Sequence, residues 1–396
     1  MKASRVGVLG AGTMGRGIAQ LAALGGYETV LYDVAPTLAE SGATALREAL
    51  EKGAGRGRWS EDDARAASAR VETTAELEQL SGCELVIEAA PEKLELKRQI
   101  FGGLAEALGP EAVFASNTSS LRVTEIAAGV PQPERVVGMH FFNPPPLMKL
   151  VEVVAAEHSS AEALATATEV AERMGRTPIR AKDSPGFVAN RLARPFSLES
   201  LRMLGDGIAD AATIDRIVRL GGGFRMGPFE LLDLIGLDTN LEIARSFFAQ
   251  GGEPERWRPL PLQEQLVAEG KLGRKSGRGY HDYDEAREPD PALGIEAPTL
   301  DPERLAKIDP AAEQVLTRLF AQVANEAAFA LEEEVASPQD METAMRLGFN
   351  WPLGPLGFAE LIGPDRAADL LERLRAEEGE AYAPAPLLRR IITSST

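Results

Sequence analysis

The chain has 396 residues, which exceeds one typical domain and suggests two or three. Its hydrophobic content of 44% and charged content of 26% are those of an ordinary globular protein. A net charge of -18 and a sequence pI near 4.8 argue against nonspecific nucleic-acid binding, which draws on excess Lys and Arg. They do not exclude a phosphorylated ligand, because local basic patches and helix N-termini also bind anions on acidic proteins.

Cysteine usage and the N-terminal residues indicate the compartment. Cys83 is the one cysteine, which rules out an intrachain disulfide framework and fits a reducing environment. It stands just before a buried-strand pattern, so we interpret it as a packing residue rather than a nucleophile. The first residues lead straight into a strand, and no long uncharged apolar run follows. We therefore expect a soluble, cytoplasmic protein with no signal peptide and no membrane span.

A glycine-rich turn follows the first predicted strand, residues 5–9. The pattern G-x-G-x-x-G begins at Gly10, and apolar residues at helical spacing follow from Gly17. Gly10 permits the tight turn, Gly12 lets the backbone approach a pyrophosphate, and Gly15 lets the helix pack closely on the strand. We expect a dinucleotide to bind at this turn, which consists of Gly10, Ala11, Gly12, Thr13, Met14 and Gly15.

The next predicted strand, residues 28–32, indicates which dinucleotide binds. It ends in Asp33, about 20 residues after the glycines. An acidic side chain there can accept hydrogen bonds from a ribose diol and would repel a 2′-phosphate. NAD(H) is therefore preferred over NADP(H). The alternative is a structural glycine turn with a solvated aspartate.

A basic, glycine-rich segment ends the helix predicted over residues 38–54. It includes Lys52, Arg56 and Arg58, within an otherwise acidic chain. One interpretation is a solvated loop. The other is a site for a phosphate-bearing ligand tail, since Arg pairs well with phosphate.

Strand patterns recur beyond this segment with helical patterns between them, at residues 84–88, 112–115 and 135–138. The alternation predicts an α/β fold with a Rossmann-type, doubly wound parallel sheet and a ligand outside the carboxyl ends of its strands. The segments that leave those ends should converge on one crevice; they are residues 89–93, 116–120 and 140–143. Ser119 and Ser120 could cap a helix from Leu121, which would leave one hydroxyl for a substrate.

Two short extended runs, residues 135–142 and 149–154, flank a turn that contains three prolines. Pro146 is the midpoint between His140 and Glu152, so folding the runs together would place the imidazole opposite the carboxylate. A carboxylate on one ring nitrogen fixes the tautomer, raises basicity and leaves the other nitrogen to exchange a proton with a substrate. The pair is either a catalytic base with its partner or a satisfied structural histidine.

Five motifs in fixed order lie within residues 5–283. They are the glycine turn at 7–15, S-N-T-S-S-L at 116–121, H-F-F-N-P at 140–144, D-S-P-G-F-V-A-N-R at 183–191 and G-P-F-E-L-L-D at 227–233. With them the sequence resembles the short-chain L-3-hydroxyacyl-CoA dehydrogenase family, which includes 3-hydroxybutyryl-CoA dehydrogenases. The resemblance implies oxidation of the 3-hydroxyl of an L-3-hydroxyacyl-CoA to a ketone with NAD, or the reverse reaction.

The resemblance also implies roles for particular side chains. His140 would be the base and Glu152 its orienting partner. Ser119 would contact the substrate oxygen and the cofactor, and Asn190 would help to position substrate and histidine. Further positions that match cofactor contacts are Glu92, Lys97 and Asn143. The other two histidines, His158 and His281, lie in polar segments, and we expect both at the surface.

The CoA contacts match the family less well. A CoA-binding serine of better-known members falls on Ala49, and the accompanying lysine falls near Arg56, so Lys52 and Arg56 are the candidates for a CoA phosphate. The departure leaves open a dehydrogenase of a free hydroxy acid or sugar acid. A noncatalytic NAD-binding protein is a third interpretation, which the intact catalytic set opposes. We expect an acyl-CoA substrate and no metal, nucleic-acid or membrane partner.

The second half of the chain reads as a duplicated helical domain. Asp183 or Ser184 is a plausible cap for its first helix, and helical periods extend to about Tyr283, before a Pro- and acid-rich linker over residues 284–309. The pattern then repeats at a constant offset, in which Glu199 corresponds to Glu326. We predict an NAD-binding domain at 1–183, a helical domain at 184–283 and its truncated second copy at 310–396.

The two copies are not equivalent. Thr317 stands where the first copy has Asn190, and the segment 271–277 has no counterpart, so we expect the second copy to be structural. Single-copy members of the family pair through their helical domains, and a fused duplicate could cover the same apolar surface within one chain. We therefore predict a pseudo-dimeric helical module in a monomer; the alternative is an ordinary homodimer with an added domain.

Overall fold

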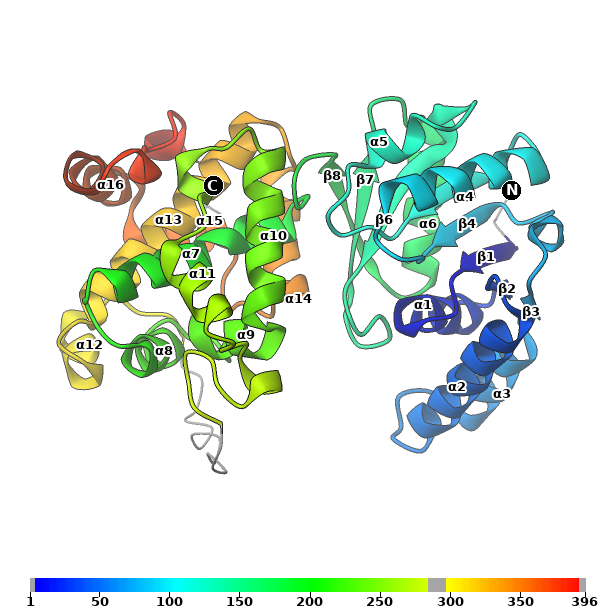
Figure 1. The fold of residues 1–396 in the computed structure, drawn as a ribbon, viewed down its shortest axis with the longest axis horizontal. Coiled ribbons are helices and arrows are strands. Elements are labelled where there is room, and N and C mark those ends of the chain that lie inside the picture. The colour runs from blue at the N-terminus through cyan, green and yellow to red at the C-terminus, as the bar shows by residue number, and fades with distance from the viewer. Residues whose placement is uncertain (1–3, 284–296, 392–396) are drawn as a thin grey trace. The chain divides into compact units, whose positions relative to one another are not determined.

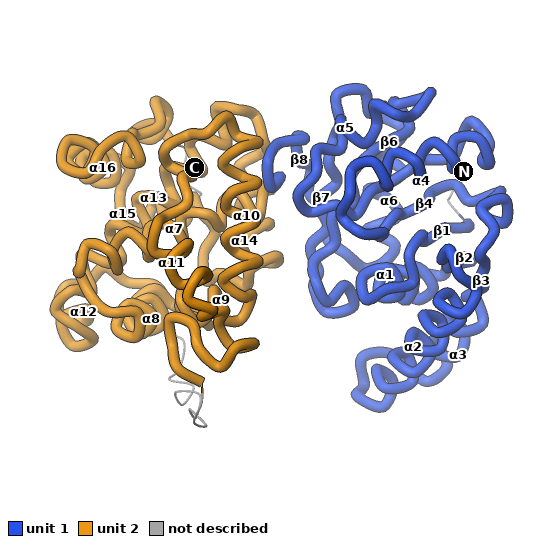
Figure 2. The backbone as a smooth tube through the Cα atoms, viewed as in Figure 1, with its two compact units in different colours: residues 1–187 blue, residues 188–396 orange. Residues whose placement is uncertain are grey.

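The computed structural model describes residues 4–283 and 297–391. The chain divides into two compact units, residues 1–187 and 188–396, which Figure 1 and Figure 2 show. The first unit is a sheet with helices and the second is helical, so the predicted fold class is confirmed. Within the described residues, no helix combines the length and apolar character that a bilayer span requires.

The first unit is built on an eight-stranded sheet, counted over the described residues, in the order β3-β2-β1-β4-β5-β6-β7-β8. Its strands are β1 (Arg5–Leu9), β2 (Glu28–Tyr32), β3 (Val71–Thr74), β4 (Leu85–Glu88), β5 (Val113–Ser116), β6 (Val136–Phe141), β7 (Leu150–Ala155) and β8 (Thr177–Lys182). Every pair of neighbours is parallel except β6 and β7, which pair antiparallel. The central strands are buried along their whole length, as expected of parallel strands covered on both faces.

Six α-helices connect these strands in the described part of the unit. They are α1 (Thr13–Leu24), α2 (Pro36–Ala54), α3 (Glu61–Ala69), α4 (Leu94–Ala107), α5 (Val123–Ala127) and α6 (Ala161–Arg173). Neither α3 nor β3 is among the elements predicted from the sequence. Cys83 packs in the core next to β4, and burial raises the pKa of its thiol to about 11, which confirms its interpretation as a packing residue.

The second unit is all-helical. Its first copy contains α7 (Ala189–Gly205), α8 (Ala211–Leu220), α9 (Pro228–Ile235), α10 (Leu237–Gln250) and α11 (Pro261–Ala268). Its second copy contains α13 (Ala312–Glu332), α14 (Pro338–Gly348), α15 (Pro355–Ile362) and α16 (Pro364–Glu378). Half of the predicted linker, residues 284–296, lies outside the described residues. A short helix, α12 (Pro302–Ile308), occupies part of the remainder.

Equivalent carboxylates cap equivalent helices in the two copies. Asp215 accepts hydrogen bonds from the backbone N–H of Phe229 (2.8 Å) and of Glu230 (3.0 Å) at the start of α9. Glu342, at the repeat offset, accepts the corresponding bonds from residues 356 (2.7 Å) and 357 (3.3 Å) at the start of α15. A carboxylate there satisfies helix N–H groups that otherwise lack a partner.

The surface assignment of His281 is wrong. Its side chain is buried, and its Nε2 lies 2.7 Å from Oδ2 of Asp215. The partner carboxylate comes from α8, 66 residues earlier in the chain, so no local pattern could reveal it. His158 is exposed, as predicted.

Reciprocal ion pairs join α7 and α13, the first helices of the two copies. Arg191 of α7 donates through Nε to Oε1 of Glu326 (2.7 Å), and Arg318 of α13 donates through Nε to Oε1 of Glu199 (2.6 Å). The two arginines correspond under the repeat, and so do the two glutamates. All four side chains are less than 5% exposed. Such an exchange of equivalent partners is the signature of an isologous interface, here formed within one chain.

We expect the Glu326→Gln substitution to lower the free energy of unfolding of the helical unit by about 3 kcal/mol, because the buried Arg191 guanidinium then has an uncharged amide at Nε and only the half-exposed Glu333 as a charged partner. Glu313→Gln is the matched control. Its partner Arg366 is half exposed, so the change should be less than about 1 kcal/mol. Urea unfolding followed by circular dichroism measures both. Equal small effects would contradict a structural role for the buried pair.

Candidate active site

The glycine turn has the geometry of a phosphate cradle. Gly10 has φ +101°, and a Cβ there would lie 2.8 Å from the carbonyl oxygen of Ala89. A Cβ on Gly15 would lie 1.7 Å from the carbonyl oxygen of Gly10, so α1 can approach the turn only without a side chain. Nothing lies within 4 Å of the position that a Cβ of Gly12 would take. The backbone at the start of α1 is therefore open to an anionic group.

Asp33 lies beside the glycine turn, just after β2. Its Oδ2 accepts a hydrogen bond from the backbone N–H of Ala11 at 2.8 Å, which ties the aspartate to the glycine turn. The side chain is only partly buried, and its second oxygen has no hydrogen bond to the described chain. An acceptor in this position fits the ribose diol of NAD. The residues present therefore fit the cofactor that the sequence predicts.

A buried charge network lies at the carboxyl end of β4. Lys97 of α4 donates through Nζ to both oxygens of Glu88, at 2.7 and 2.9 Å, and lies 3.2 Å from Oε2 of Glu92. Ser116 of β5 donates through its hydroxyl to Oε2 of Glu88 at 2.6 Å. The Lys97 and Glu88 side chains are at most 1% exposed. Lys97 therefore positions the carboxylate of Glu92 from behind.

Glu92 holds the loop after β5 in place. Its Oε1 accepts hydrogen bonds from the Thr118 hydroxyl (2.6 Å), the Ser119 N–H (3.0 Å) and the Ser120 N–H (3.1 Å). Burial opposes ionisation of Glu92, but the positive charge of Lys97 and these hydrogen bonds outweigh it and lower the pKa of the carboxyl. The Ser119 side chain is exposed, and its hydroxyl has no hydrogen bond to the described residues. It is thus available to a ligand.

Two predicted helix caps are wrong. Helix α5 begins at Val123, and neither Ser119 nor Ser120 caps it. Asp183 is one of two candidate caps for the first helix of the second unit, with Ser184. It instead accepts hydrogen bonds from the backbone N–H of Val123 (3.0 Å) and of Thr124 (2.8 Å) at the start of α5. Helix α7 has no side-chain cap of its own. Asp183 follows β8, which places its carboxylate at the N-terminus of α5. It therefore accepts hydrogen bonds from backbone N–H groups about 60 residues earlier in the chain.

The predicted pairing of the two extended runs is confirmed. Residues 140 and 152 are direct partners in the antiparallel register of β6 and β7. Nδ1 of His140 lies 2.6 Å from Oε2 of Glu152, whose side chain is fully buried. A carboxylate at this nitrogen favours the tautomer with its proton on Nδ1, which leaves Nε2 with a free lone pair.

Aromatic side chains enclose the imidazole. The ring centroids of Phe142 and Phe187 lie 4.5 and 5.8 Å from that of His140, and the His140 side chain is 8% exposed. Nε2 has no hydrogen bond to any part of the chain that the structure describes. The ring is therefore held on three sides while one nitrogen stays unpaired, which is the arrangement that a proton acceptor requires.

Sequence reasoning missed two residues that shape the site. Asn117 accepts a hydrogen bond through Oδ1 from the backbone N–H of Phe141 at 2.8 Å, which joins the end of β5 to the end of β6 beside His140. Glu88, the last residue of β4, anchors Lys97 as described above. Each residue follows or ends a buried strand. A polar residue at the carboxyl end of a predicted strand is therefore the sequence feature that could have identified both.

The remaining predicted residues lie in both units. Asn143 is exposed and precedes Pro144 in a cis peptide bond just after β6. Asn190 belongs to the helical unit, where it is the second residue of α7 and is half-buried. Within the described residues, no group of three or more His, Cys, Asp or Glu side chains is arranged to hold a metal ion.

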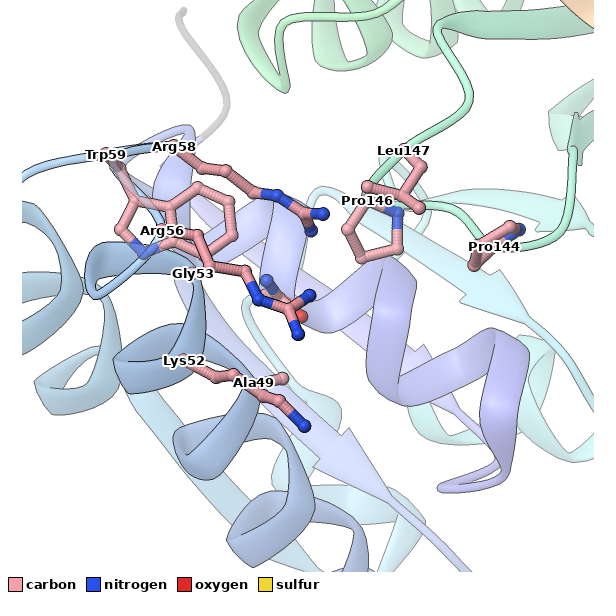
Figure 3. Close-up of a pocket in the computed structure, with 10 residues that line it drawn as sticks. Ala49, Lys52, Gly53, Arg56, Arg58, Trp59, Pro144, Pro146 and Leu147 are labelled. Carbon is pink, nitrogen blue, oxygen red and sulfur yellow. The ribbon is translucent and has the colours of Figure 1, made fainter. Parts of the chain in front are cut away.

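The basic segment after α2 lines a pocket of about 200 Å³. Lys52, Arg56, Arg58 and Trp59 lie on one side, and the turn over residues 144–147 lies on the other. Figure 3 shows the guanidinium groups of Arg56 and Arg58 extending toward this turn. Trp59 donates through Nε1 to the carbonyl oxygen of Leu50 at 2.8 Å, which fixes the indole in the wall. None of the three cations forms an ion pair with another described residue.

Two sequence models of one family match the chain. The model described as 3-hydroxyacyl-CoA dehydrogenase, NAD binding domain, matches residues 5–184. The model described as 3-hydroxyacyl-CoA dehydrogenase, C-terminal domain, matches residues 186–283 and again residues 315–395. The two matches of the C-terminal model follow the repeat inferred from the sequence.

Individual relatives agree with the family models. A 3-hydroxyadipyl-CoA dehydrogenase of Escherichia coli is 34% identical, over 97% of this chain and 96% of its own. A probable 3-hydroxybutyryl-CoA dehydrogenase of Bacillus subtilis is 41% identical, over 72% of this chain and 99% of its own. A crystal structure of 3-hydroxybutyryl-CoA dehydrogenase from Escherichia coli superimposes with a TM-score of 0.89 at 34% identity, covering 98% of each chain.

Proposed function

The chain belongs to the 3-hydroxyacyl-CoA dehydrogenase family, and from this premise we propose that it interconverts an L-3-hydroxyacyl-CoA and the 3-ketoacyl-CoA with His140 as the proton-transfer group. As a family member it is an NAD-dependent oxidoreductase that acts on a CH–OH group. The observation that carries the proposal is the 2.6 Å contact between Nδ1 of His140 and Oε2 of Glu152. The other ring nitrogen, Nε2, has no hydrogen bond to the described residues.

Each catalytic side chain has a distinct task in the oxidation. Bound NAD⁺ supplies the hydride acceptor. His140 takes the hydroxyl proton at Nε2, and Glu152 stabilises the imidazolium that results. The free hydroxyl of Ser119 holds the substrate oxygen in line with the histidine, and the family resemblance gives the amide of Asn190 a contact with the same oxygen. In reduction the same groups work in the opposite order, and Nε2 returns the proton to the oxygen.

The pocket after α2 supports recognition of the CoA portion. Its cations lack acidic partners among the described residues, and a guanidinium pairs well with a phosphate. Trp59 and Pro146 add apolar surface beside them. The turn that forms one wall follows directly on β6, which carries His140. A thioester whose phosphates bind this pocket would thus be anchored by the segment that carries the base.

The names of the relatives suggest two acyl groups. One relative is named for a 3-hydroxyadipyl chain and others for a 3-hydroxybutyryl chain. Both groups carry the hydroxyl at C3 of a CoA thioester, so the mechanism above serves either. We propose that the substrate is a short 3-hydroxyacyl-CoA.

We predict that His140→Gln and Glu152→Gln lower kcat by at least about 100-fold, because each removes the proton acceptor or its charged partner. Acetoacetyl-CoA-dependent oxidation of NADH is the assay. NADH affinity should stay within a few-fold of the wild-type value, since neither residue belongs to the glycine turn. His158→Gln, at an exposed histidine, is the control. Wild-type turnover in His140→Gln would refute the assignment.

The Arg56→Ala substitution is expected to raise the KM for acetoacetyl-CoA about tenfold, with little change in kcat, because it removes uniform binding of a phosphate. The KM for acetoacetyl-N-acetylcysteamine, which lacks the phosphates, should not change. Arg65→Ala, on α3 outside this pocket, controls for loss of positive charge. An equal rise in the KM for both thioesters would mean that the CoA phosphates bind outside this pocket. Faster turnover of free acetoacetate than of its CoA thioester by the wild-type protein would favour a free hydroxy acid as substrate.

We also propose that the α7–α13 pairing replaces the helical contact of a homodimer, which makes the chain a monomer with an internal pseudo-dimer of residues 184–283 and 310–396. The four side chains of the reciprocal ion pairs support this, because they are already buried within one chain. The helix faces that carry them are therefore not available to a second chain. Sedimentation equilibrium should give the mass of one chain, 42.4 kDa. An obligate dimer would contradict the proposal.

A further inference from the structure

Arg194 in helix α7 is a buried cation that the chemistry proposed above does not use. The residue is 6% exposed. Its guanidinium carbon lies 5.3 Å from the ring centroid of Phe247 in α10, a cation–π contact. Burial lowers the pKa of Arg194 to about 10, so the side chain remains charged at neutral pH.

No carboxylate of the described residues balances this charge. Within residues 4–283 and 297–391, Arg194 has neither a carboxylate partner nor a hydrogen bond, and its buried Nε is without an acceptor. The arginine one turn earlier provides the contrast, since Arg191 is equally buried but pairs with Glu326 and Glu333. A buried charge normally has a counter-ion. The cation–π contact compensates only part of what burial costs, so the guanidinium is left to pair with an anion that the described residues do not supply.

The duplicated helix serves as an internal control for whether the fold needs this arginine. Helix α13 repeats α7 and retains the structural ion-pair residues Arg318 and Glu326 at the repeat offset. At the offset of Arg194 it has Ala321, which is fully buried. The position thus packs well with a methyl group. Arg194 and Asn190 are both absent from the structural copy, whereas the interface residues are kept in both.

The position of Arg194 relative to Asn190 suggests what it binds. Residues four apart lie on one face of a helix, separated by about 6 Å along its axis. Asn190 is the residue proposed to hold the C3 oxygen of the substrate. A group that meets Arg194 therefore lies a short distance farther along the acyl chain. A six-carbon chain, with a carboxylate three carbons beyond the hydroxyl carbon, covers a comparable length.

We propose that Arg194 binds a carboxylate at the far end of the acyl chain, which makes the substrate a 3-hydroxyacyl-CoA derived from a dicarboxylic acid. The inference rests on the proposed function and adds the substrate class. A guanidinium recognises a carboxylate through two parallel charge-assisted hydrogen bonds. The unpaired Nε of Arg194 is one of the donors that such a pair requires. A chain that ends in a methyl group would leave this charge buried and unpaired.

The test compares two thioesters of equal length, 3-hydroxyadipyl-CoA and 3-hydroxyhexanoyl-CoA, which differ only in a terminal carboxylate against a methyl group. The ratio of their kcat/KM values in NAD reduction is measured for the wild-type protein and for Arg194→Met, Arg194→Lys and Arg202→Met. The last variant is the control, because Arg202 lies in the same helix but pairs with Glu199.

We expect the wild-type ratio to favour the adipyl thioester by at least ~30-fold, a preference that Arg194→Met abolishes. Arg194→Lys should retain part of it, and Arg202→Met all of it. A wild-type ratio near one, or a ratio that Arg194→Met leaves intact, would overturn the proposal. Turnover of neither thioester by the wild-type protein would instead count against the proposed function itself.

Thermal melting shows whether Arg194→Met folds. If it does not, a second measurement on the wild-type protein tests the proposal. Adipyl-CoA and hexanoyl-CoA lack the 3-hydroxyl and serve as dead-end inhibitors of the wild-type protein. An inhibition constant for adipyl-CoA that is at least ~10-fold lower than that for hexanoyl-CoA supports the proposal. Equal inhibition constants would overturn it without any variant.

Discussion

The antiparallel pairing of β6 with β7 is the constraint on which the site depends. It places residues 140 and 152 directly opposite each other in the one antiparallel pair of the described sheet. Because side chains alternate between the faces of a strand, a shift of the register by one residue would turn either member of the pair to the opposite face. The proline-rich turn at 144–146 and the hydrogen bond from Phe141 to Asn117 hold that register next to the end of β5. The base and its partner are thus positioned by backbone pairing, and the imidazole needs little reorganisation to accept a proton.

The second half of the molecule separates structural from functional residues by duplication. Capping carboxylates and reciprocal arginine–glutamate pairs recur in both copies, since each copy needs them to fold and to pair. Asn190 and Arg194 occur in the first copy only, where α7 is proposed to meet the substrate. The copies thus distinguish what a helix needs for packing from what it needs for recognition, a distinction usually drawn from comparisons between proteins. In this view the second copy stabilises the first, and the first supplies the specificity.

Local signals predicted the parts of the fold that local chemistry determines. The glycine turn, the apolar strands and the symmetry of His140 and Glu152 about Pro146 follow from backbone freedom and strand alternation, and the structure agrees with them. The misses share a different cause. Helix α3 and strand β3 are short, with nine and four residues. Asp183 and His281 find partners 60 and 66 residues away, and Glu88 gains its importance only when α4 brings Lys97 against it. Partners distant in sequence leave no trace in a single chain, so such roles emerge only from the tertiary structure.

We propose that Glu152 holds the proton of His140 on Nδ1, so that Nε2 is free to accept one from the substrate. The ¹⁵N chemical shifts of the His140 ring, measured by NMR on uniformly labelled protein at neutral pH, test this directly. We expect a protonated Nδ1 and an unprotonated Nε2 in the wild-type protein, and loss of this preference in Glu152→Ala. A ring that carries its proton on Nε2 in the wild-type protein would contradict it.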